Sequence, residues 1–443
     1  MKKPFVLLLT AILFAFTACV DEKKPEWSPA PNPLMTRWAA SVDPAGPWPE
    51  YPRPQMQREE WMNLNGLWDY QLVRKGSEQG LYAGKILVPY PVESALSGIA
   101  DSVGPGDMIF YRRYFEIPRG WTDKKILLHF EAVDWETRVY INGNEVGSHR
   151  GGYDPFSFDI SQYLNEGENE ITVEVSDPTN EGYQPRGKQV LTPGGILYTP
   201  SSGIWQTVWI EPVPQTFVSD IKITPDIDNA KAIFDISVAS PGPGDQIHIR
   251  VLDQGKVVSE GSTNGGTHII IPVNNPKPWS PSDPFLYDLE ISVNRDGKLL
   301  DKISSYFGMR KIEKKSGPDG FVRLYLNGEA LFHNGPLDQG FWPDGLYTPP
   351  TDEAMKFDVE MTKKMGFNML RKHVKVENRR FYYWCDKLGI MVWQDMPSTS
   401  GYVAPDKADL DRPEEEREQF TMELEHLIMT RYNHPSIVMW VPF

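Results

Sequence analysis

The sequence predicts a multidomain chain of the β plus α/β class, in which two β-sandwiches precede the first half of an eight-stranded β/α barrel. At roughly 150 residues per domain, a chain of 443 residues has room for about three domains. Its 39 prolines and 36 glycines favour turn-rich β structure over long helices. After Arg310 the apolar residues change from the period of strands to the period of helices.

Residues 1–18 have the three parts of a secretory signal peptide. Met1-Lys-Lys is basic, a mainly apolar run follows from Phe5 to Phe16, and small residues precede Cys19. The run is too short for a bilayer, which needs about 20 residues, and a buried helix is the alternative. A cysteine at this place resembles the lipobox of bacterial lipoproteins, which implies lipidation of Cys19; an ordinary cleavage site is the other alternative. We expect an exported, membrane-anchored lipoprotein, periplasmic or at the cell surface.

The charge of the chain excludes several partners. Cleavage before Cys19 removes two of the 45 basic residues, Lys2 and Lys3, and takes the net charge from −15 to −17. Without a basic patch the chain is not expected to bind nucleic acid. It is not expected to adhere electrostatically to anionic lipid either, which leaves acyl chains as the anchor in an outer or plasma membrane. Only Cys385 then remains, so no intrachain disulfide is possible.

Residues 19–57 read as a Pro-rich, lipid-linked tether. Proline-rich segments are extended and semi-rigid, and such a segment would lift the body of the protein off a membrane. Trp38 and Trp48 lie in its later part and are candidates to pack on the first domain. The prolines between Val20 and Pro54 are Pro25, Pro29, Pro31, Pro33, Pro44, Pro47, Pro49, Pro52 and Pro54.

Residues 58–214 are predicted to form a β-sandwich. Strand-like runs cover 126–131 and 137–141, and Asn142-Gly143, which favours two-residue hairpin turns, follows directly. The run 170–175 alternates polar and apolar residues, as a half-buried strand does.

A second β-sandwich is predicted for residues 215–309. Turn signals lie at 241–244 and 294–297. The length fits an immunoglobulin-like domain, although the segment has no cysteine pair. The expected strands are 218–223, 231–238, 246–251, 268–273, 287–293 and 303–307.

Residues 310–443 are predicted to form strands 1–4 of the barrel. One helical stripe begins after Thr351 and ends at Gly366, a second contains Phe381, Cys385 and Leu388 and ends at Gly389, and a third begins at Pro413. Runs that are apolar on both faces suit a buried parallel sheet. The expected strands are 330–333, 367–370, 390–393 and 437–443.

Polar residues follow these strands, at the end of a barrel where active sites form. Carboxylates and amides bind sugar hydroxyls, and indole rings cover the C–H face of a pyranose. Arg371 and Asp395 could instead form a structural ion pair, His373 could be a satisfied histidine, and the tryptophans could belong to the core. Asn433, His434, His149 and Arg150 are expected to be structural. The candidate sugar-binding residues are Asp338, Trp342, Asp344, Arg371, His373, Trp393 and Asp395.

Several motifs resemble glycoside hydrolase family 2 (β-galactosidase, β-glucuronidase, β-mannosidase). The run 140–160 is similar to the jelly-roll, sugar-binding-like domain that opens these enzymes, and 431–443 is similar to their fourth barrel strand. Arg371 and His373 take the place of an Arg and a His that hold the sugar and the active-site carboxylates. Trp393-Gln-Asp395 looks like the mannosidase and glucosaminidase branch, whereas Asp338-Gln339 stands where galactosidases and glucuronidases have His-Glu. The sugar and linkage therefore stay open.

The resemblance implies a retaining exo-β-glycoside hydrolase that takes oligo- or polysaccharide glycans and needs no cofactor. In this family the catalytic acid/base follows strand 4 and the nucleophile comes from strand 7, so no catalytic residue is assigned here and both are expected beyond Phe443. The alternatives are a non-catalytic glycan-binding surface lipoprotein and an inactive truncated product. No metal-ligand spacing, phosphate-binding loop or serine nucleophile motif is present in the sequence.

Overall fold

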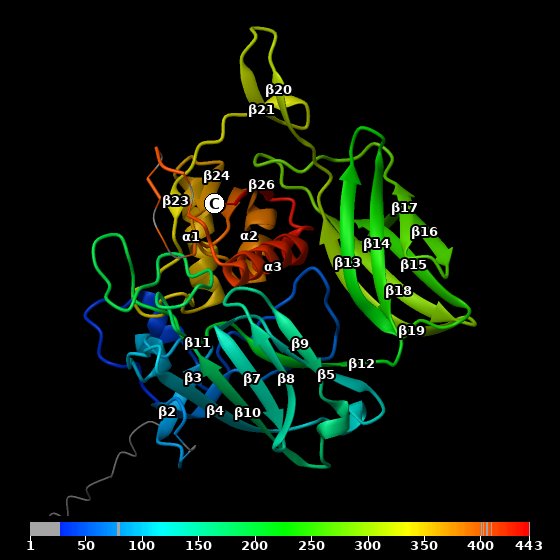
Figure 1. Cartoon of the computed structure of the whole chain (residues 1–443). Helices are drawn as coiled ribbons and strands as arrows, with labels where there is room; N and C mark the ends of the chain where they lie inside the picture. Colours follow the sequence, from blue (N-terminus) through cyan, green and yellow to red (C-terminus); the bar gives the residue numbers. More distant parts are fainter. Residues whose placement is uncertain are drawn as a thin grey trace, which may run out of the picture.

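A computed structural model of the protein describes residues 27–77, 80–399, 401, 403–404, 406–408 and 410–442. Three domains lie against one another: a lower β-sandwich, a second β-sandwich at the right, and a smaller α/β unit above the first (Figure 1). The predicted order of two β-sandwiches and half of a barrel is confirmed. The predicted signal peptide and Cys19 lie outside the described residues. None of the helices in the described ranges is long and apolar enough to cross a membrane.

The stretch from Trp27 to Gln57 packs on the body instead of acting as a spacer. Trp48 is 6% exposed, and its indole Nε1 donates to the Pro349 carbonyl at 3.2 Å. The Trp38 ring lies 5.6 Å from that of Phe357 on the first helix of the barrel unit. The described part of the predicted tether is therefore a strap that joins the first and third domains. It contains the 3-10 helix η1 (Arg37–Ser41).

The first domain is a jelly-roll-like sandwich of antiparallel sheets with strand orders β1-β12-β5-β9 and β3-β2-β4-β10-β7-β8, and a small β11-β6 pair. Alternate residues of β10 are buried, as the sequence pattern predicts. Asn142 and Gly143 both have positive φ in the β7–β8 turn. Its strands are β1 (Met62–Asn63), β2 (Gly66–Arg74), β3 (Gly84–Val88), β4 (Asp107–Glu116), β5 (Lys125–Phe130), β6 (Val133–Asp134), β7 (Glu136–Ile141), β8 (Asn144–Arg150), β9 (Phe156–Asp159), β10 (Glu168–Ser176), β11 (Gly203–Ile204) and β12 (Val208–Val213), and its 3-10 helices are η2 (Ala95–Ser97), η3 (Arg119–Trp121) and η4 (Ser161–Tyr163).

The second domain is an immunoglobulin-like sandwich of two antiparallel sheets, ordered β13-β14-β17 and β16-β15-β18-β19. The inward residues of both sheets form one core around Phe234, Ile249 and Ile291. β16 was not predicted, because partly buried and exposed positions alternate in it and few large apolar residues occur. Its strands are β13 (Phe217–Asp226), β14 (Lys231–Ala239), β15 (Asp245–Asp253), β16 (Lys256–Asn264), β17 (His268–Pro272), β18 (Tyr287–Arg295) and β19 (Lys298–Phe307).

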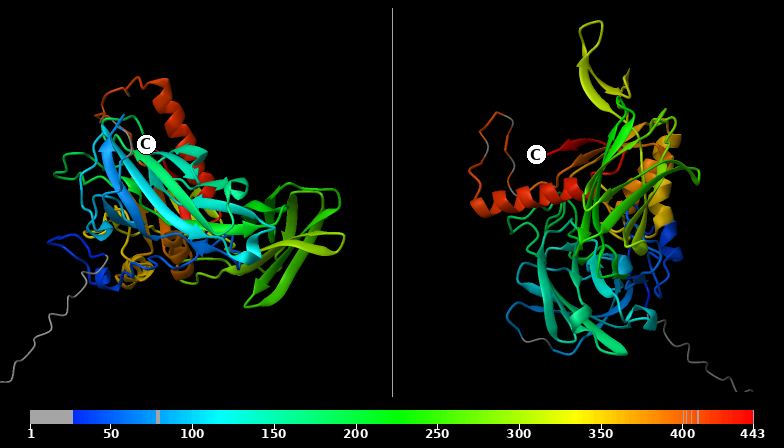
Figure 2. Two further views of the ribbon diagram at one scale, coloured as in Figure 1. Left: turned by 90° about the horizontal axis from the view of Figure 1, so that it is seen from below. Right: turned by 90° about the vertical axis from the view of Figure 1, so that its right-hand side faces the viewer.

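A small antiparallel sheet that the sequence analysis did not predict opens the third domain and projects from the body (Figures 1 and 2). It consists of β20 (Ile312–Ser316), β21 (Val322–Leu326) and β22 (Glu329–Ala330). The prediction of a first barrel strand at 330–333 is therefore wrong, because Ala330 belongs to β22 and pairs antiparallel with Tyr325 of β21. The first parallel strand is instead β23 (Leu337–Asp338).

The parallel sheet of the third domain has the order β23-β24-β25-β26, as four successive strands of a barrel would have. The helices begin and end close to the predicted positions: the Thr351 side chain caps the first, and Gly389 caps the second in a left-handed conformation. The elements are α1 (Asp352–Lys364), β24 (Met369–Lys372), α2 (Arg379–Leu388), β25 (Met391–Asp395), α3 (Glu414–Arg431) and β26 (Ile437–Val441).

Buried polar contacts join the second and third domains. The Asp386 carboxylate on α2 accepts a hydrogen bond from Tyr306 Oη at 2.8 Å and lies 2.6 Å from His434 Nδ1. The Asn433 side-chain oxygen accepts a hydrogen bond from the Ile223 backbone at 2.7 Å. These contacts confirm that Asn433 and His434 are structural.

Candidate functional site

The register of the parallel sheet divides the candidate residues between its two faces. Arg371 lies opposite Trp393 in the register of β24 and β25, and Lys372 lies opposite Gln394. Because side chains alternate along a strand, Arg371, Trp393 and Asp395 share one face. The other face packs on the helices, since the Gln394 side-chain oxygen accepts from Tyr382 Oη of α2 at 2.6 Å.

Arg371, His373 and Asp395 come together where β24 and β25 end. Arg371 Nε donates to both carboxylate oxygens of Asp395, at 2.9 and 3.1 Å, and the Val374 backbone N–H donates to one of them at 3.3 Å. His373 Nε2 lies 4.0 Å from the same carboxylate. Asp395 is fully buried, whereas the Arg371 side chain is 32% exposed. Asp395 thus orients Arg371, and Arg371 and His373 are the groups that can touch a ligand.

Two side chains that the sequence analysis did not select hold the imidazole. Tyr198 Oη donates to the side-chain oxygen of Gln339 at 2.6 Å, and Gln339 Nε2 lies 3.0 Å from His373 Nδ1. Since the Gln339 amide donates to Nδ1, the neutral imidazole carries its proton on Nε2, which faces Asp395. Burial lowers the pKa of His373, an effect that Asp395 opposes and that Arg371 and Lys188 reinforce. The ring is therefore a neutral N–H donor near pH 7.

The structure places Asp338 apart from this group. Its carboxylate accepts from Lys372 Nζ at 2.7 Å, and Lys372 also donates to Glu377 at 3.0 Å. Burial acts to raise the pKa of Asp338, but the Lys372 ammonium outweighs it and holds the pKa below its usual range. Asp338 therefore takes part in a charge cluster behind the sheet.

Lys375 completes that cluster and is fully buried. Its Nζ donates to the carbonyls of Gly340 and Tyr347, at 2.6 and 2.8 Å, and to Glu377 at 2.8 Å. Burial lowers its pKa to about 8, although the Glu377 carboxylate opposes this. With three acceptors around it, the ammonium fixes the loop after β23.

Asp344, Trp342 and Trp393 do not join Arg371 and His373 either. Asp344 is fully buried and accepts from both the backbone and the hydroxyl of Thr36 in the strap, at 2.8 and 2.6 Å. Trp342 is partly exposed, and its backbone pairs with that of Leu346 in the loop after β23. Trp393 shares the face of Arg371, but its indole Nε1 donates to His333 at 2.9 Å. The prediction of one common opening for seven residues is therefore corrected to Arg371, His373 and, behind them, Asp395.

A cavity of about 940 Å³ opens beside His373. The jelly-roll loop contributes Arg186, Gly187, Lys188 and Leu197 to it, which no pattern in the sequence indicates because the contact is purely tertiary. The opposite wall comes from the segment after β25 and from α3. Its lining residues are Arg186, Gly187, Lys188, Leu197, His373, Val374, Ser398, Thr399, Gly401, Val403, Arg412, Glu416, Arg417, Phe420 and Thr421.

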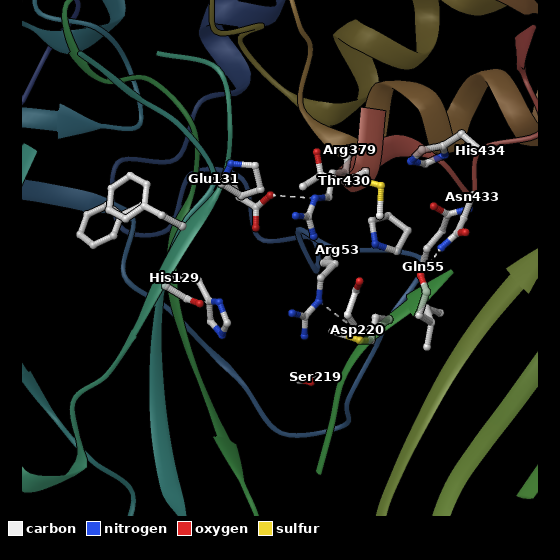
Figure 3. Close-up of a pocket in the computed structure, with 18 residues that line it drawn as sticks. Arg53, Gln55, His129, Glu131, Ser219, Asp220, Arg379, Thr430, Asn433 and His434 are labelled. Atoms are coloured by element: carbon white, nitrogen blue, oxygen red, sulfur yellow. Dashed lines mark hydrogen bonds and ion pairs between the residues drawn. The ribbon is translucent and has the colours of Figure 1, made fainter. Parts of the chain in front are cut away.

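A smaller cavity, of about 260 Å³, lies where the strap and all three domains meet (Figure 3). Arg53, His129, Asp220 and Arg379 lie around it. Arg53 donates to the fully buried Glu211 at 2.7 Å, and Arg379 lies 3.5 Å from Glu131. Since these guanidinium groups have carboxylate partners, we interpret this cavity as part of a domain junction.

Within the described ranges no group of three His, Cys, Asp or Glu side chains is arranged to hold a metal ion. The candidate site is therefore described by its hydrogen-bonding groups, the partly exposed Arg371 guanidinium and the neutral His373 imidazole, and by the large cavity beside His373.

Three models of one enzyme family match successive parts of the chain. The sugar-binding domain of glycosyl hydrolases family 2 matches residues 55–184, a second model of glycosyl hydrolases family 2 matches 216–310, and the family's TIM barrel domain matches 350–441.

Curated relatives are similar at low identity. A β-galactosidase of Thermoanaerobacter pseudethanolicus is 27% identical over 351 residues, which are 75% of this chain and 44% of that protein. A β-glucuronidase of Paenibacillus borealis is 25% identical over 421 residues, which are 88% of this chain and 68% of that protein. The chain also spans 49% of a β-glucuronidase of Bacteroides fragilis, at 28% identity.

Among solved structures, a β-glucuronidase from Ruminococcus gnavus in complex with D-glucuronic acid superposes with a TM-score of 0.73 at 24% identity. The superposition covers 87% of this chain and 67% of that one. A β-D-glucuronidase of Dictyoglomus thermophilum superposes with a TM-score of 0.72 over 88% of this chain. At this identity the likeness establishes the shared fold.

Proposed function

We propose that this chain, which carries the sugar-binding, immunoglobulin-like and TIM-barrel domains of glycoside hydrolase family 2, forms the glycan-binding part of a retaining exo-β-glycosidase. Its sugar contacts are Arg371 and His373. The relatives include both β-galactosidases and β-glucuronidases, so the proposal names β-linked pyranosides as the class and leaves the individual sugar to experiment.

One observation carries the proposal: the partly exposed Arg371 guanidinium, oriented by the buried Asp395, and the neutral His373 imidazole, held by Gln339, lie together at the carboxyl end of β24. In a β/α barrel the catalytic and binding groups gather at this end. An N–H donor from each side chain can reach a hydroxyl or ring substituent of a pyranose, while the carboxylate behind Arg371 fixes its geometry.

The acid/base and the nucleophile are assigned outside the described residues. A retaining mechanism needs two carboxyls about 5–5.5 Å apart. Asp395 forms an ion pair with Arg371, and Asp338 forms one with Lys372. Glu416 forms an ion pair with Arg412 at 2.6 Å. A carboxylate paired with a cation in this way stays ionised and is a poor proton donor. We therefore expect this 443-residue chain to bind glycosides and to hydrolyse them at most slowly.

The test is binding of β-galactosides, β-glucuronides and β-mannosides to the 443-residue chain by calorimetry, with His373→Ala as the variant. Loss of one hydrogen bond from the imidazole is expected to weaken binding about tenfold, equivalent to ~1.4 kcal/mol. His268→Ala is the control, because His268 is an exposed residue of β17 in the second domain and should leave binding unchanged.

Chromogenic glycosides test the assignment of the catalytic groups. If the 443-residue chain turned them over at rates typical of glycosidases, the carboxyls would have to be among the residues described above. If no β-glycoside bound, or if His268→Ala and His373→Ala weakened binding equally, the sugar site would be misplaced.

A lipid-anchored location is proposed from residues 1–19. The support is the basic start, the apolar run and Cys19. Labelling of cells with a radioactive fatty acid should mark the wild-type protein and not Cys19→Ser. Equal labelling of both, or of neither, would exclude lipidation at this cysteine.

A non-catalytic glycan-binding lipoprotein is the second candidate. The observation that favours it is that Asp395, behind Arg371 and His373, and Glu416, in the wall of the large cavity, both have cationic partners. Glycan binding by the natural full-length gene product, without hydrolysis of any of the three glycoside classes, would select this alternative.

A further inference from the structure

We propose that the loop 186–198 of the jelly-roll domain forms an anion subsite, which binds a carboxylate or sulfate on a glycan unit beyond the sugar held by Arg371 and His373. The inference rests on the proposed function, since it takes the ligand of the large cavity to be a glycan. It adds the chemical class of that glycan, namely one that carries acidic groups. The groups that bind them are Arg186 and Lys188.

Arg186 lies in the cavity wall without a carboxylate partner among the described residues. One guanidinium nitrogen donates to the Gln189 carbonyl at 2.6 Å, while its Nε is shielded from solvent and has no hydrogen-bond partner. Burial lowers the pKa of this guanidinium. An N–H group that is shielded and unpaired is energetically unfavourable, and an anionic ligand would relieve it.

Lys188 supplies a second cation two residues further along. Its Nζ donates to the Ile196 carbonyl across the loop at 3.1 Å, and no carboxylate in the described part of the chain pairs with it. Lys188 is close enough to His373 for its charge to lower the pKa of the imidazole. The anion subsite therefore adjoins the proposed sugar contacts.

The loop is held in place against the barrel unit. The backbone N–H groups of Arg186 and Gly187 both donate to the Ser398 carbonyl, at 2.9 and 3.0 Å. Gly187 has a φ of +61°, and a Cβ at this position would lie 2.2 Å from the Val374 carbonyl oxygen. Only glycine permits this approach, so the two cations are presented from a fixed backbone.

The other charged groups of the cavity do not cancel these cations. Glu416 is the one carboxylate among the lining residues described above, and Arg412 binds it at 2.6 Å. Arg417 also lines the wall, and the exposed Asp411 carboxylate lies 3.8 Å from its guanidinium. The unbalanced charges are therefore those of Arg186 and Lys188. In a chain with a net charge of −15, such a local excess of cations is unusual. It favours a negatively charged group by charge complementarity.

The volume of the cavity, about 940 Å³, lies at the upper end of the range of small-molecule sites. It therefore has room for more than one pyranose unit. An acidic glycan can place one sugar at His373 and an anionic substituent of the next unit against the loop. Carboxylate and sulfate share the ability to accept several N–H bonds from guanidinium and ammonium groups, and the experiment separates them.

The test compares one β-linked oligosaccharide in neutral, uronate-bearing and sulfated forms, by calorimetry on the 443-residue chain. Wild type should bind at least one anionic form about tenfold more tightly than the neutral form, and added salt should reduce this preference. Lys188→Gln and the double variant Arg186→Gln/Lys188→Gln should lose the preference and retain binding of the neutral form. Lys188→Gln is expected to leave the fold unchanged, because the Lys188 side chain makes one hydrogen bond, to the Ile196 carbonyl.

Lys298→Gln is the matched control, since it removes one positive charge at an exposed position of β19 in the second domain. Equal affinity for neutral and anionic forms, or an equal loss of preference in Lys298→Gln and Lys188→Gln, would overturn the anion subsite alone. If no form bound, the proposed glycan site would fall as well. A preference for the uronate or for the sulfate form identifies the group that is recognised.

Discussion

The domain junction and the large cavity beside His373, called the barrel mouth below, both contain charged side chains, but the charges are arranged in opposite ways. At the junction, Glu211 is fully buried and meets Arg53 at 2.7 Å, Arg58 at 3.3 Å and His129 at 3.2 Å. At the mouth, Arg186 and Lys188 have no carboxylate partner in the described ranges, and one nitrogen of Arg186 has no hydrogen-bond partner.

The difference separates groups that hold the domains together from groups that can receive a ligand. Burial acts to raise the pKa of Glu211, but Arg53, His129 and Arg58 outweigh it and hold the pKa well below its usual range. Such a carboxylate stays ionised and bound within the protein. Arg186 and Lys188 line an open cavity without a carboxylate partner in the described ranges, which is the expected condition of groups that receive a ligand.

Glu211→Gln should produce the largest change in stability. The substitution leaves Arg53 buried without its carboxylate, which is expected to cost about 3–5 kcal/mol of unfolding free energy. Urea unfolding measures it. Glu290→Gln is the control, because Glu290 also meets two cations but all three side chains are at least 27% exposed, and its loss should cost no more than about 1 kcal/mol. Equal losses would show that burial does not distinguish the junction.

Glu93→Gln should stabilise the protein at high pH. Burial raises the pKa of Glu93 to about 8, and no cation pairs with it in the described part of the chain. Between the usual pKa of 4.5 and about 8 the unfolded chain loses a proton that the folded one keeps. Stability therefore falls as pH rises through this window. At pH 9 the free energy of unfolding of Glu93→Gln should exceed that of wild type by on the order of 3 kcal/mol.

At pH 4, where both states bind the proton, Glu93→Gln and wild type should unfold at similar urea concentrations. The Ser202 backbone N–H, which donates to Glu93 at 2.9 Å, can donate equally to the glutamine oxygen. A difference that stays the same at pH 4 and pH 9 would contradict a raised pKa.

Gly187→Ala and Gly195→Ala should change stability less than the substitutions above, but they test directly whether the loop 186–198 is fixed at Gly187. Both glycines have a φ of +61°, but a Cβ at 187 would lie 2.2 Å from the Val374 carbonyl and at 195 would meet nothing within 4 Å. Gly195→Ala should therefore cost only the left-handed conformation, about 1–2 kcal/mol. Gly187→Ala should cost more and also weaken glycan binding, because the loop must move. Thermal unfolding and calorimetry measure both effects, and equal behaviour would mean that the loop is not fixed at Gly187.

Much of the fold could be predicted from local patterns. The Asn142-Gly143 turn, the Thr351 cap and the end of α2 at Gly389 follow from backbone preferences of single residues. The β20–β22 sheet was missed because its strands carry many Lys, Glu and Arg residues, and the two buried residues, Tyr325 and Leu326, are too few to give a pattern. The first barrel strand was misplaced because β23 has only two residues, which give no periodic pattern.

The candidate site was predicted only in part. Arg371, His373 and Asp395 are found together because strand ends gather at one edge of a parallel sheet. Asp338 pairs with Lys372 behind the sheet, and a strand of two residues gives no alternation from which to predict its face. Asp344 binds Thr36 in the strap, a residue more than 300 positions away. No local pattern contains such a contact.

The sequence by itself determined the kinds of elements, their order and the end of the barrel unit at which polar groups gather, because these depend on periodicity and on backbone preferences near each residue. Only the tertiary structure decided which of these polar groups come into contact. It also decided that Arg186 and Lys188 of the jelly-roll domain line the cavity. Charges act through space, and their neighbours are set by how the domains pack.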